Sequence, residues 1–163
     1  MPSLTKPELH ARILASLGSH VIAKGSVDSV PLPLEVTNVV PLAIWAFTLT
    51  NPPGGRHPAE SKIQLIVPGQ GRRDRANLTG PPERFKLLVG VHPDDDLYVL
   101  WDAYKQRDFT WSKNVQVRGQ LLWDAQVEGI ATGRRRLANA TETVIVARGD
   151  RLRDGIALRI EAD

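Results

Sequence analysis

The feature that most constrains the fold is a series of short β-forming runs separated by turns of only a few residues. Residues 84–91 (RFKLLVGV) and 96–103 (DLYVLWDA) flank the turn HPDD, and proline and aspartate are turn-forming residues. The two runs are therefore predicted to form a β-hairpin. Parallel strands need a crossover connection of a dozen or more residues, so such short turns argue against a doubly wound nucleotide-binding fold.

Further strands are predicted at 42–50, 61–69, 114–118 and 141–147. The first is rich in β-forming residues and stops at the proline- and glycine-rich run NPPGGRHP, and the second alternates polar and apolar residues before Pro-Gly. The segment 26–41 has proline interleaved with apolar residues, which predicts an extended, irregular stretch that leads into a strand.

Helices are predicted at both ends of the chain and once between. Thr5 is the predicted N-cap of the first helix, Pro7 and Glu8 suit its first turn, and Gly18 ends it, with His10 on its outer face. The other two helices are predicted at residues 120–130 and 147–161. The resulting class is α+β: a mostly antiparallel sheet, curled or closed into a pseudobarrel, with flanking N-terminal and C-terminal helices.

Length and composition limit the functions to consider. The 163 residues suit one domain, 1–163, and the absence of cysteine excludes disulfides and thiolate zinc sites. No apolar run reaches the roughly 18 residues of a membrane span, so we expect a cytoplasmic protein without a membrane partner. Neither a Walker loop nor a G-x-S-x-G elbow occurs, and the histidines lack ligand spacing, so no cofactor or metal is expected for a binding domain.

Positive charge is concentrated in two short runs. The net charge is only +3, but the pI is near 9.5, and the densest basic runs are GRRDR at 71–75 and GRRRL at 133–137. Both are predicted to be loops. Two such runs in one small domain favour a partner with a phosphate backbone, although a solvated loop explains either run taken alone.

The segment 101–119, WDAYKQRDFTWSKNVQVRG, combines aromatic, basic and amide side chains. Basic groups neutralise phosphates, amides hydrogen-bond base edges, and aromatic faces stack on unpaired bases. The segment could equally be an ordinary hairpin with Trp101, Phe109 and Trp111 in the core, or the interface of a protein-interaction module. The predicted DNA-binding set is Arg72, Arg73, Arg75, Lys105, Arg107, Trp111, Ser112, Lys113, Asn114, Gln116, Arg118, Arg134, Arg135 and Arg136.

A compact nuclease is the enzymatic alternative. Glu60 and Lys62 have the E-x-K spacing of metal-dependent nucleases, in which the carboxylate holds Mg²⁺ and the lysine orients water. A second carboxylate is required, and Glu35 is a nearby upstream candidate. Mg²⁺ is a cofactor only under this hypothesis.

Three runs, ESKIQLIVPGQGRR, FKLLVGVHPDDDLYVLWDAYKQRDFTWSKNVQVRG and GIATGRRRL, resemble the recognition domains of bacterial restriction endonucleases, especially modification-dependent ones. The similarity covers about residues 40 to 150. It implies a curled sheet of the SRA or pseudobarrel type, double-stranded DNA, methylated or unmethylated, as partner, and a nuclease domain or subunit as a further partner. It also implies a pocket for a flipped methylated cytosine. By the chemistry of the cytosine edge, Asp102 is the candidate that accepts a hydrogen bond from the exocyclic amine. The candidate pocket residues are Tyr98, Trp101, Asp102, Tyr104 and Trp111.

Overall fold

The computed structural model describes residues 3–51 and 60–162, so most of the NPPGGRHP run lies outside the described residues. The α-helices are α1 (Lys6–Leu17), α2 (Gly119–Glu128) and α3 (Leu152–Glu161). Short 3₁₀ turns are η1 (Gly18–His20), η2 (Ala103–Lys105) and η3 (Gly149–Arg151). The strands are β1 (Val21–Lys24), β2 (Leu32–Val36), β3 (Leu42–Thr48), β4 (Glu60–Leu65), β5 (Arg75–Ala76), β6 (Phe85–Val91), β7 (Leu97–Trp101), β8 (Phe109–Thr110), β9 (Lys113–Arg118), β10 (Ile130–Arg136) and β11 (Thr141–Arg148).

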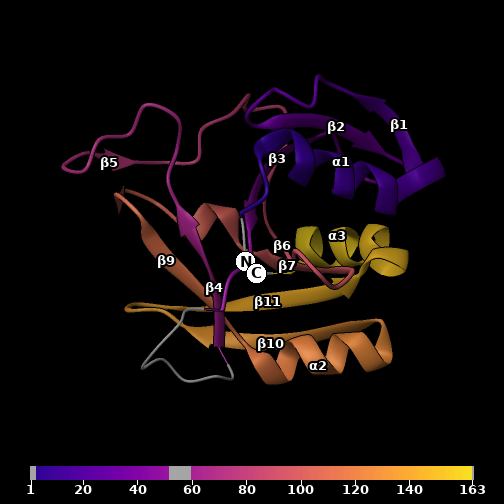
Figure 1. Ribbon diagram of the computed structural model, residues 1–163. Coiled ribbons are helices and arrows are strands. Elements are labelled where there is room, and N and C mark those ends of the chain that lie inside the picture. Colours follow the sequence, from indigo (N-terminus) through magenta and orange to yellow (C-terminus); the bar gives the residue numbers. More distant parts are fainter. Residues whose placement is uncertain (1–2, 52–59, 163) are drawn as a thin grey trace.

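A curled, open sheet organises the described residues (Figure 1). Its order is β1-β2-β3-β6-β7-β11-β10, and β3 with β6 is the parallel pair of this sheet, the other neighbours being antiparallel. The predicted α+β class, with a mostly antiparallel curled sheet and a helix near each end, is confirmed. The predicted hairpin forms β6 and β7.

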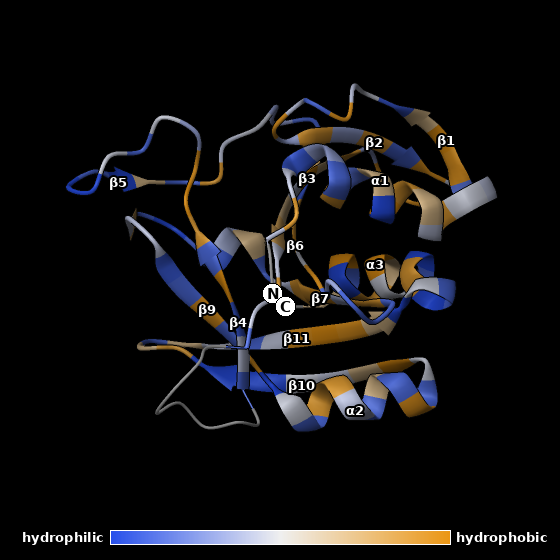
Figure 2. Ribbon diagram, in the orientation of Figure 1, coloured by the Kyte–Doolittle hydropathy of each residue, from blue (hydrophilic) through white to orange (hydrophobic). Residues whose placement is uncertain are grey.

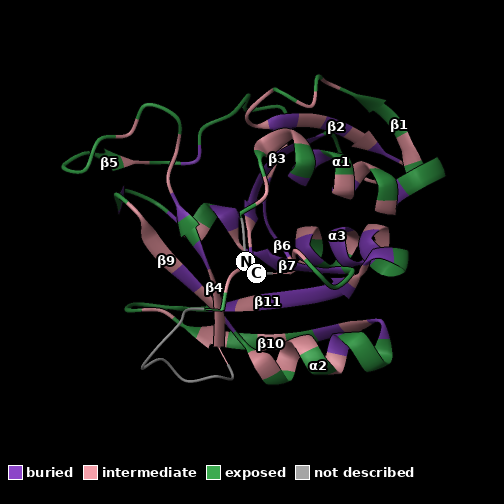
Figure 3. Cartoon of the chain, in the orientation of Figure 1, coloured by how far each residue is buried: buried purple, intermediate pink, exposed green. Residues whose placement is uncertain are grey.

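Alternation along the central strands gives the sheet two buried faces. In β7, Tyr98 and Leu100 point to one face, whereas Val99 and Trp101 point to the other, and all four are at most 2% exposed. Helices α1 and α3 cover the first face (Figure 1), and the central strands are buried throughout (Figure 3).

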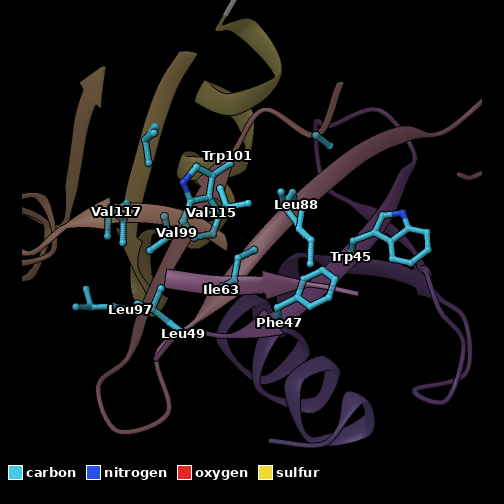
Figure 4. Packing of buried hydrophobic residues seen from close by; sticks show 14 of the residues in the cluster. Trp45, Phe47, Leu49, Ile63, Leu88, Leu97, Val99, Trp101, Val115 and Val117 are labelled. Atoms are coloured by element: carbon cyan, nitrogen blue, oxygen red, sulfur yellow. The ribbon is translucent and has the colours of Figure 1, made fainter. Parts of the chain in front are cut away.

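The second face is covered by α2 and by the two-stranded ribbon of β4 and β9. Ile63 from β4 and Val115 from β9 are fully buried against Trp101, as Figure 4 shows. Complete burial of such a side chain stabilises a fold by about 1.5–3 kcal/mol. The ribbon is therefore held firmly on the sheet although its strands do not pair with those of the sheet.

Helix α1 begins as predicted, at a capping box. The Thr5 hydroxyl accepts a hydrogen bond from the Glu8 amide, and the Glu8 carboxylate accepts one from the Thr5 amide. His10 corrects the prediction, because its side chain is buried and its Nδ1 lies 2.7 Å from the Val27 carbonyl oxygen. The segment after α1 packs over that side of the helix, which a helical projection alone does not show.

Several element boundaries also differ from the predictions. The irregular segment contains β2, and the strand predicted at 61–69 ends at Leu65. The 133–137 basic run, predicted to be a loop, lies largely in β10, where residues Ile130 to Arg136 pair in register with β11. No helix in the described part of the chain has the length and apolar character that crossing a bilayer requires.

Candidate nucleic-acid interface

A groove of about 430 Å³ lies where the end of β9, the start of α2 and the far half of β10 meet. Its lining includes Gln116, Arg118 and the three β10 arginines from the predicted DNA-binding set, and Glu60 from the nuclease hypothesis. Arginines outnumber carboxylates in the lining, so the groove is electropositive. Its charged residues are Arg118, Arg134, Arg135, Arg136, Glu60 and Asp124.

The β10 register determines how its three arginines are presented. Arg134 and Arg136 are exposed on one side of the strand, and Arg135 points to the opposite, inner side. Arg134 donates a hydrogen bond to the Thr141 hydroxyl at 2.7 Å. The side chain of Arg136 has no hydrogen-bond or ion-pair partner within residues 3–51 and 60–162, and the same holds for the exposed side chain of Arg118. These two guanidinium groups are available to a ligand.

Helix α2 closes one wall of the groove. A Cβ at Gly133 would lie 3.2 Å from Leu121, so glycine lets the helix pack directly on β10. The helix begins at Gly119, and its N-cap residue, Arg118, makes no side-chain capping hydrogen bond. The first amide groups of a helix carry partial positive charge, which adds to that of the arginines at this wall.

A buried carboxylate holds the inner arginine. Glu142 is 0% exposed, and its Oε1 lies 2.8 Å from Nη1 of Arg135. Its Oε2 accepts from the Asp102 amide at 3.0 Å and from the Gln106 side chain at 3.4 Å. Burial raises the pKa of the Glu142 carboxyl. This network joins the β10–β11 hairpin to the segment that follows β7.

The two lysines of the predicted set are engaged within the protein. Lys113 Nζ donates to Gln106 Oε1 at 3.0 Å, and burial is the main cause that lowers its pKa. Lys105 Nζ donates to the Thr141 carbonyl oxygen at 2.6 Å. Both side chains therefore fix the segment between β7 and β9.

A second basic group lies on a wing built from the β4–β5 loop and the short β5–β8 pair (Figure 1). The Arg72 guanidinium lies 5.5 Å from the ring centre of Trp111, which is 36% exposed. Arg75 donates to the Asp108 carbonyl oxygen at 2.9 Å and lies 3.6 Å from its carboxylate. Arg73 and Arg107 are exposed. The wing is thus a basic, partly aromatic surface.

The predicted base-reading residues lie on and beside β9. Asn114 and Gln116 alternate with buried Val115 and face away from the core. Ser112 is in the turn before the strand with φ of 59°, a left-handed conformation. Figure 2 shows β9 as a largely hydrophilic strand beside a hydrophobic sheet.

The structure brings together part of the predicted base pocket. Strand β7 ends at Trp101, and the Asp102 carboxylate then caps η2 by accepting from the Tyr104 amide at 2.9 Å. These three residues line a cavity of about 170 Å³. Trp101 is 0% exposed, however, and donates from Nε1 to the Gln116 carbonyl oxygen at 3.0 Å.

The other two pocket candidates lie elsewhere. Tyr98 is buried on the opposite face of the sheet, where its hydroxyl donates to the Arg12 carbonyl oxygen at 2.9 Å and burial raises its pKa. Trp111 is on the wing. The predicted five-residue pocket is therefore divided among three places.

The residues of the nuclease hypothesis are also separated. Glu60 and Lys62 share one face of β4, but Lys62 Nζ donates to Asn114 Oδ1 at 3.0 Å. Glu35 lies on β2, which Figure 1 shows on the far side of the molecule from the start of β4. Among the described residues no group of three or more His, Asp or Glu could hold a metal ion.

Sequence reasoning missed Glu142 and Gln106, which organise the interface without being exposed. Glu142 stands in the β-forming run TETVIVA, where a polar residue is expected to face water. Only its pairing opposite Arg135 reveals that it faces inward. The sequence carries no local signal for that pairing.

Comparison with known proteins identifies the family. A family profile described as Methylase-associated X1 matches residues 40–156, which is more than half of the chain. The chain belongs to the Methylase-associated X1 family. The match includes the groove, the wing and the β4–β9 ribbon. No curated protein and no solved structure matches the chain significantly. The description of the family suggests an association with restriction–modification systems.

Proposed function

We propose that this Methylase-associated X1 domain is a DNA-recognition module of a restriction–modification system and binds duplex DNA through the arginine groove. One observation carries the proposal: four arginines line a single groove at the start of α2, and three of them, Arg118, Arg134 and Arg136, are exposed. The DNA phosphates release counterions when arginines neutralise them, and this gives most of the affinity of a non-specific complex. A methylase or nuclease subunit is the proposed partner that uses the recognition.

The charge balance of the groove supports an anionic ligand. Four arginines face two carboxylates in the lining, and one of these carboxylates, Asp124, also accepts a hydrogen bond from Gln120 at 2.8 Å. Arg118 and Arg136 make no ion pair within the described residues, so a phosphate would break none of the interactions seen there. Guanidinium groups bind phosphate oxygens in bidentate geometry, which suits a groove lined by arginine rather than lysine.

Fluorescence anisotropy with a labelled 20-base-pair duplex of mixed sequence tests the proposal. The double variant R118A/R136A is expected to bind at least tenfold more weakly than wild type at low salt, because two phosphate contacts are lost. Arg151 is a matched control, since it is exposed in η3, beside Gly129 at the C-terminal end of α2, and paired with Asp154 at 3.1 Å. Wild-type affinity that does not fall as salt rises would contradict phosphate binding by the groove.

A flipped, methylated cytosine is a second candidate ligand, favoured by the cavity that Trp101, Asp102 and Tyr104 line. The test compares one duplex with and without 5-methylcytosine. Tighter binding of the methylated duplex, lost in D102N, would support the pocket, and equal binding by wild type would refute it.

A further inference from the structure

Two strands that are remote in sequence form a ribbon with one apolar and one polar face. β4 and β9 pair antiparallel, with Lys62 opposite Gln116 and Gln64 opposite Asn114. Gln64 is exposed, and Asn114 and Gln116 are half-buried at its side. The ribbon therefore presents a compact array of carboxamides away from the core.

The ribbon is rigid because its other face is packed. The alternate residues Ile63, Leu65 and Val115 are 0% exposed in the core. Backbone hydrogen bonds of 2.8 Å in both directions between Lys62 and Thr50 hold the outer edge of β4. A base-reading surface needs this order, because positioning of the polar groups then costs little entropy on binding.

Hydrogen bonds within the ribbon also orient one of its amides. The Lys62 ammonium can only donate, and it lies 3.0 Å from Asn114 Oδ1. The amide NH₂ of Asn114 must then be its outward group and a donor. Gln64 lies directly opposite, and no hydrogen bond within the described part of the chain occupies the donor or the acceptor of its side-chain amide.

The dimensions and the flanking charges match one crossing of a major groove. Five residue steps along β9 span about 17 Å, and the major groove is about 12 Å wide and admits a two-stranded ribbon. The arginine groove lies at the Arg118 end of β9, and the wing with Arg72 and Trp111 lies beyond the Lys113 end (Figure 1). Basic side chains therefore lie at both ends of the array of amides.

We infer that the β4–β9 ribbon enters the major groove of duplex DNA and reads base edges with Gln64, Asn114 and Gln116. Glutamine and asparagine make paired hydrogen bonds to the N6 and N7 atoms of adenine, so the sites bound most tightly contain adenine. The inference rests on the proposed DNA binding and deepens it. Gln64, which lies on β4 outside the 101–119 segment and was not in the predicted DNA-binding set, is thereby assigned a role in base specificity.

The probe is a library of duplexes with ten randomised base pairs between fixed arms, bound by the full chain and sequenced. Wild type is expected to enrich adenine at defined positions by about tenfold, the discrimination that one good bidentate contact gives. Q64A is expected to lose the preference at one position and Q116A at another. Q126A is the matched control, because Gln126 is exposed on α2, away from the ribbon. The affinity of Q64A, Q116A and Q126A for a fixed mixed-sequence duplex, measured by anisotropy, is expected to differ less than threefold from that of wild type.

The outcomes separate the inference from the proposed function. Salt-sensitive binding by wild type without any enriched base would overturn the ribbon as a reader and leave DNA binding standing. Enrichment that Q64A and Q116A retain would also overturn it. Circular dichroism and urea denaturation of each variant show whether it is folded. If Q64A is misfolded, Q64E replaces it. The glutamate carboxylate cannot donate to adenine N7 and repels phosphate, so Q64E should also lose the adenine preference. Failure of wild type to bind at low salt would overturn both proposals.

Discussion

Replacement of Arg135 with alanine is expected to destabilise the fold far more than the same change at its neighbour Arg134. The Glu142 carboxylate is fully buried, and the Arg135 guanidinium lies 2.8 Å from it. Removing one partner of a buried ion pair costs about 3–5 kcal/mol, because the remaining charge is uncompensated. The Arg135 side chain is 23% exposed, so water can partly replace it, and we expect the lower limit, about 3 kcal/mol.

Urea denaturation followed by circular dichroism measures the effect. With a slope of about 2 kcal/mol/M, R135A should lower the midpoint by about 1.5 M. R134A removes one exposed hydrogen bond to Thr141 and is expected to cost about 0.5 kcal/mol or less. R135A/E142A should regain part of the loss, since it removes the orphan charge. Equal midpoints for R135A and R134A would refute the reasoning.

The same carboxylate gives a pH dependence with a definite sign. Burial raises the pKa of Glu142 above its ordinary value of 4.5, so the folded state binds the proton more tightly than the unfolded chain does. Wild type should therefore gain stability relative to E142Q as the pH falls through the pKa that Glu142 has in the folded protein. The gain is complete below the pKa that Glu142 has in the unfolded chain. Paired urea titrations between neutral pH and 4.5 check this. A difference that stays constant or reverses would contradict it.

Three further changes test the fold. T5A breaks the capping box with Glu8 and should cost about 1 kcal/mol in urea denaturation, and an unchanged midpoint would count against the cap. G90A places a Cβ 2.8 Å from the Trp101 ring and should cost about 1–3 kcal/mol with altered tryptophan fluorescence; wild-type stability would show that the ring can move aside. Burial lowers the pKa of Lys6 to about 8, so wild type should gain stability relative to K6M as pH rises from 8 towards 10.5, and a falling difference would contradict that burial.

The elements that sequence could predict are those with local signals. The β6–β7 hairpin has two β-forming runs and a proline–aspartate turn, and α1 has a capping box. These features depend on residues a few positions apart. The α+β class follows from them, because strands joined by short turns exclude repeated crossovers.

The parts that sequence could not predict depend on pairing between remote segments. The arginine run of β10 is polar on both sides and reads as a loop, and only its register with β11 makes it a strand. The ribbon joins β4 to β9 across the intervening hairpin. The parallel pairing of β3 with β6 is also remote in sequence, because β4 and the wing lie between these two strands in the chain.

The sequence indicates which residue types the candidate site contains, but it does not indicate how the structure arranges them. Both basic runs reach the surface, but one forms a groove wall and the other a separate wing. Lys105 and Lys113 have the right charge, yet they hold the segment between β7 and β9. A residue type indicates what a side chain can bind, and burial decides whether it is available.

The most direct test of the account is the salt dependence of duplex binding by wild type and by R118A/R134A/R136A. Each phosphate contact contributes about −0.9 to the slope of log affinity against log salt concentration. We expect wild type to bind with a slope of about −5, allowing for the groove and the wing, and the triple variant to bind with a slope shallower by about 2 to 3. Equal slopes in the two proteins, or no salt dependence in wild type, would contradict the central claim that the arginine groove binds DNA.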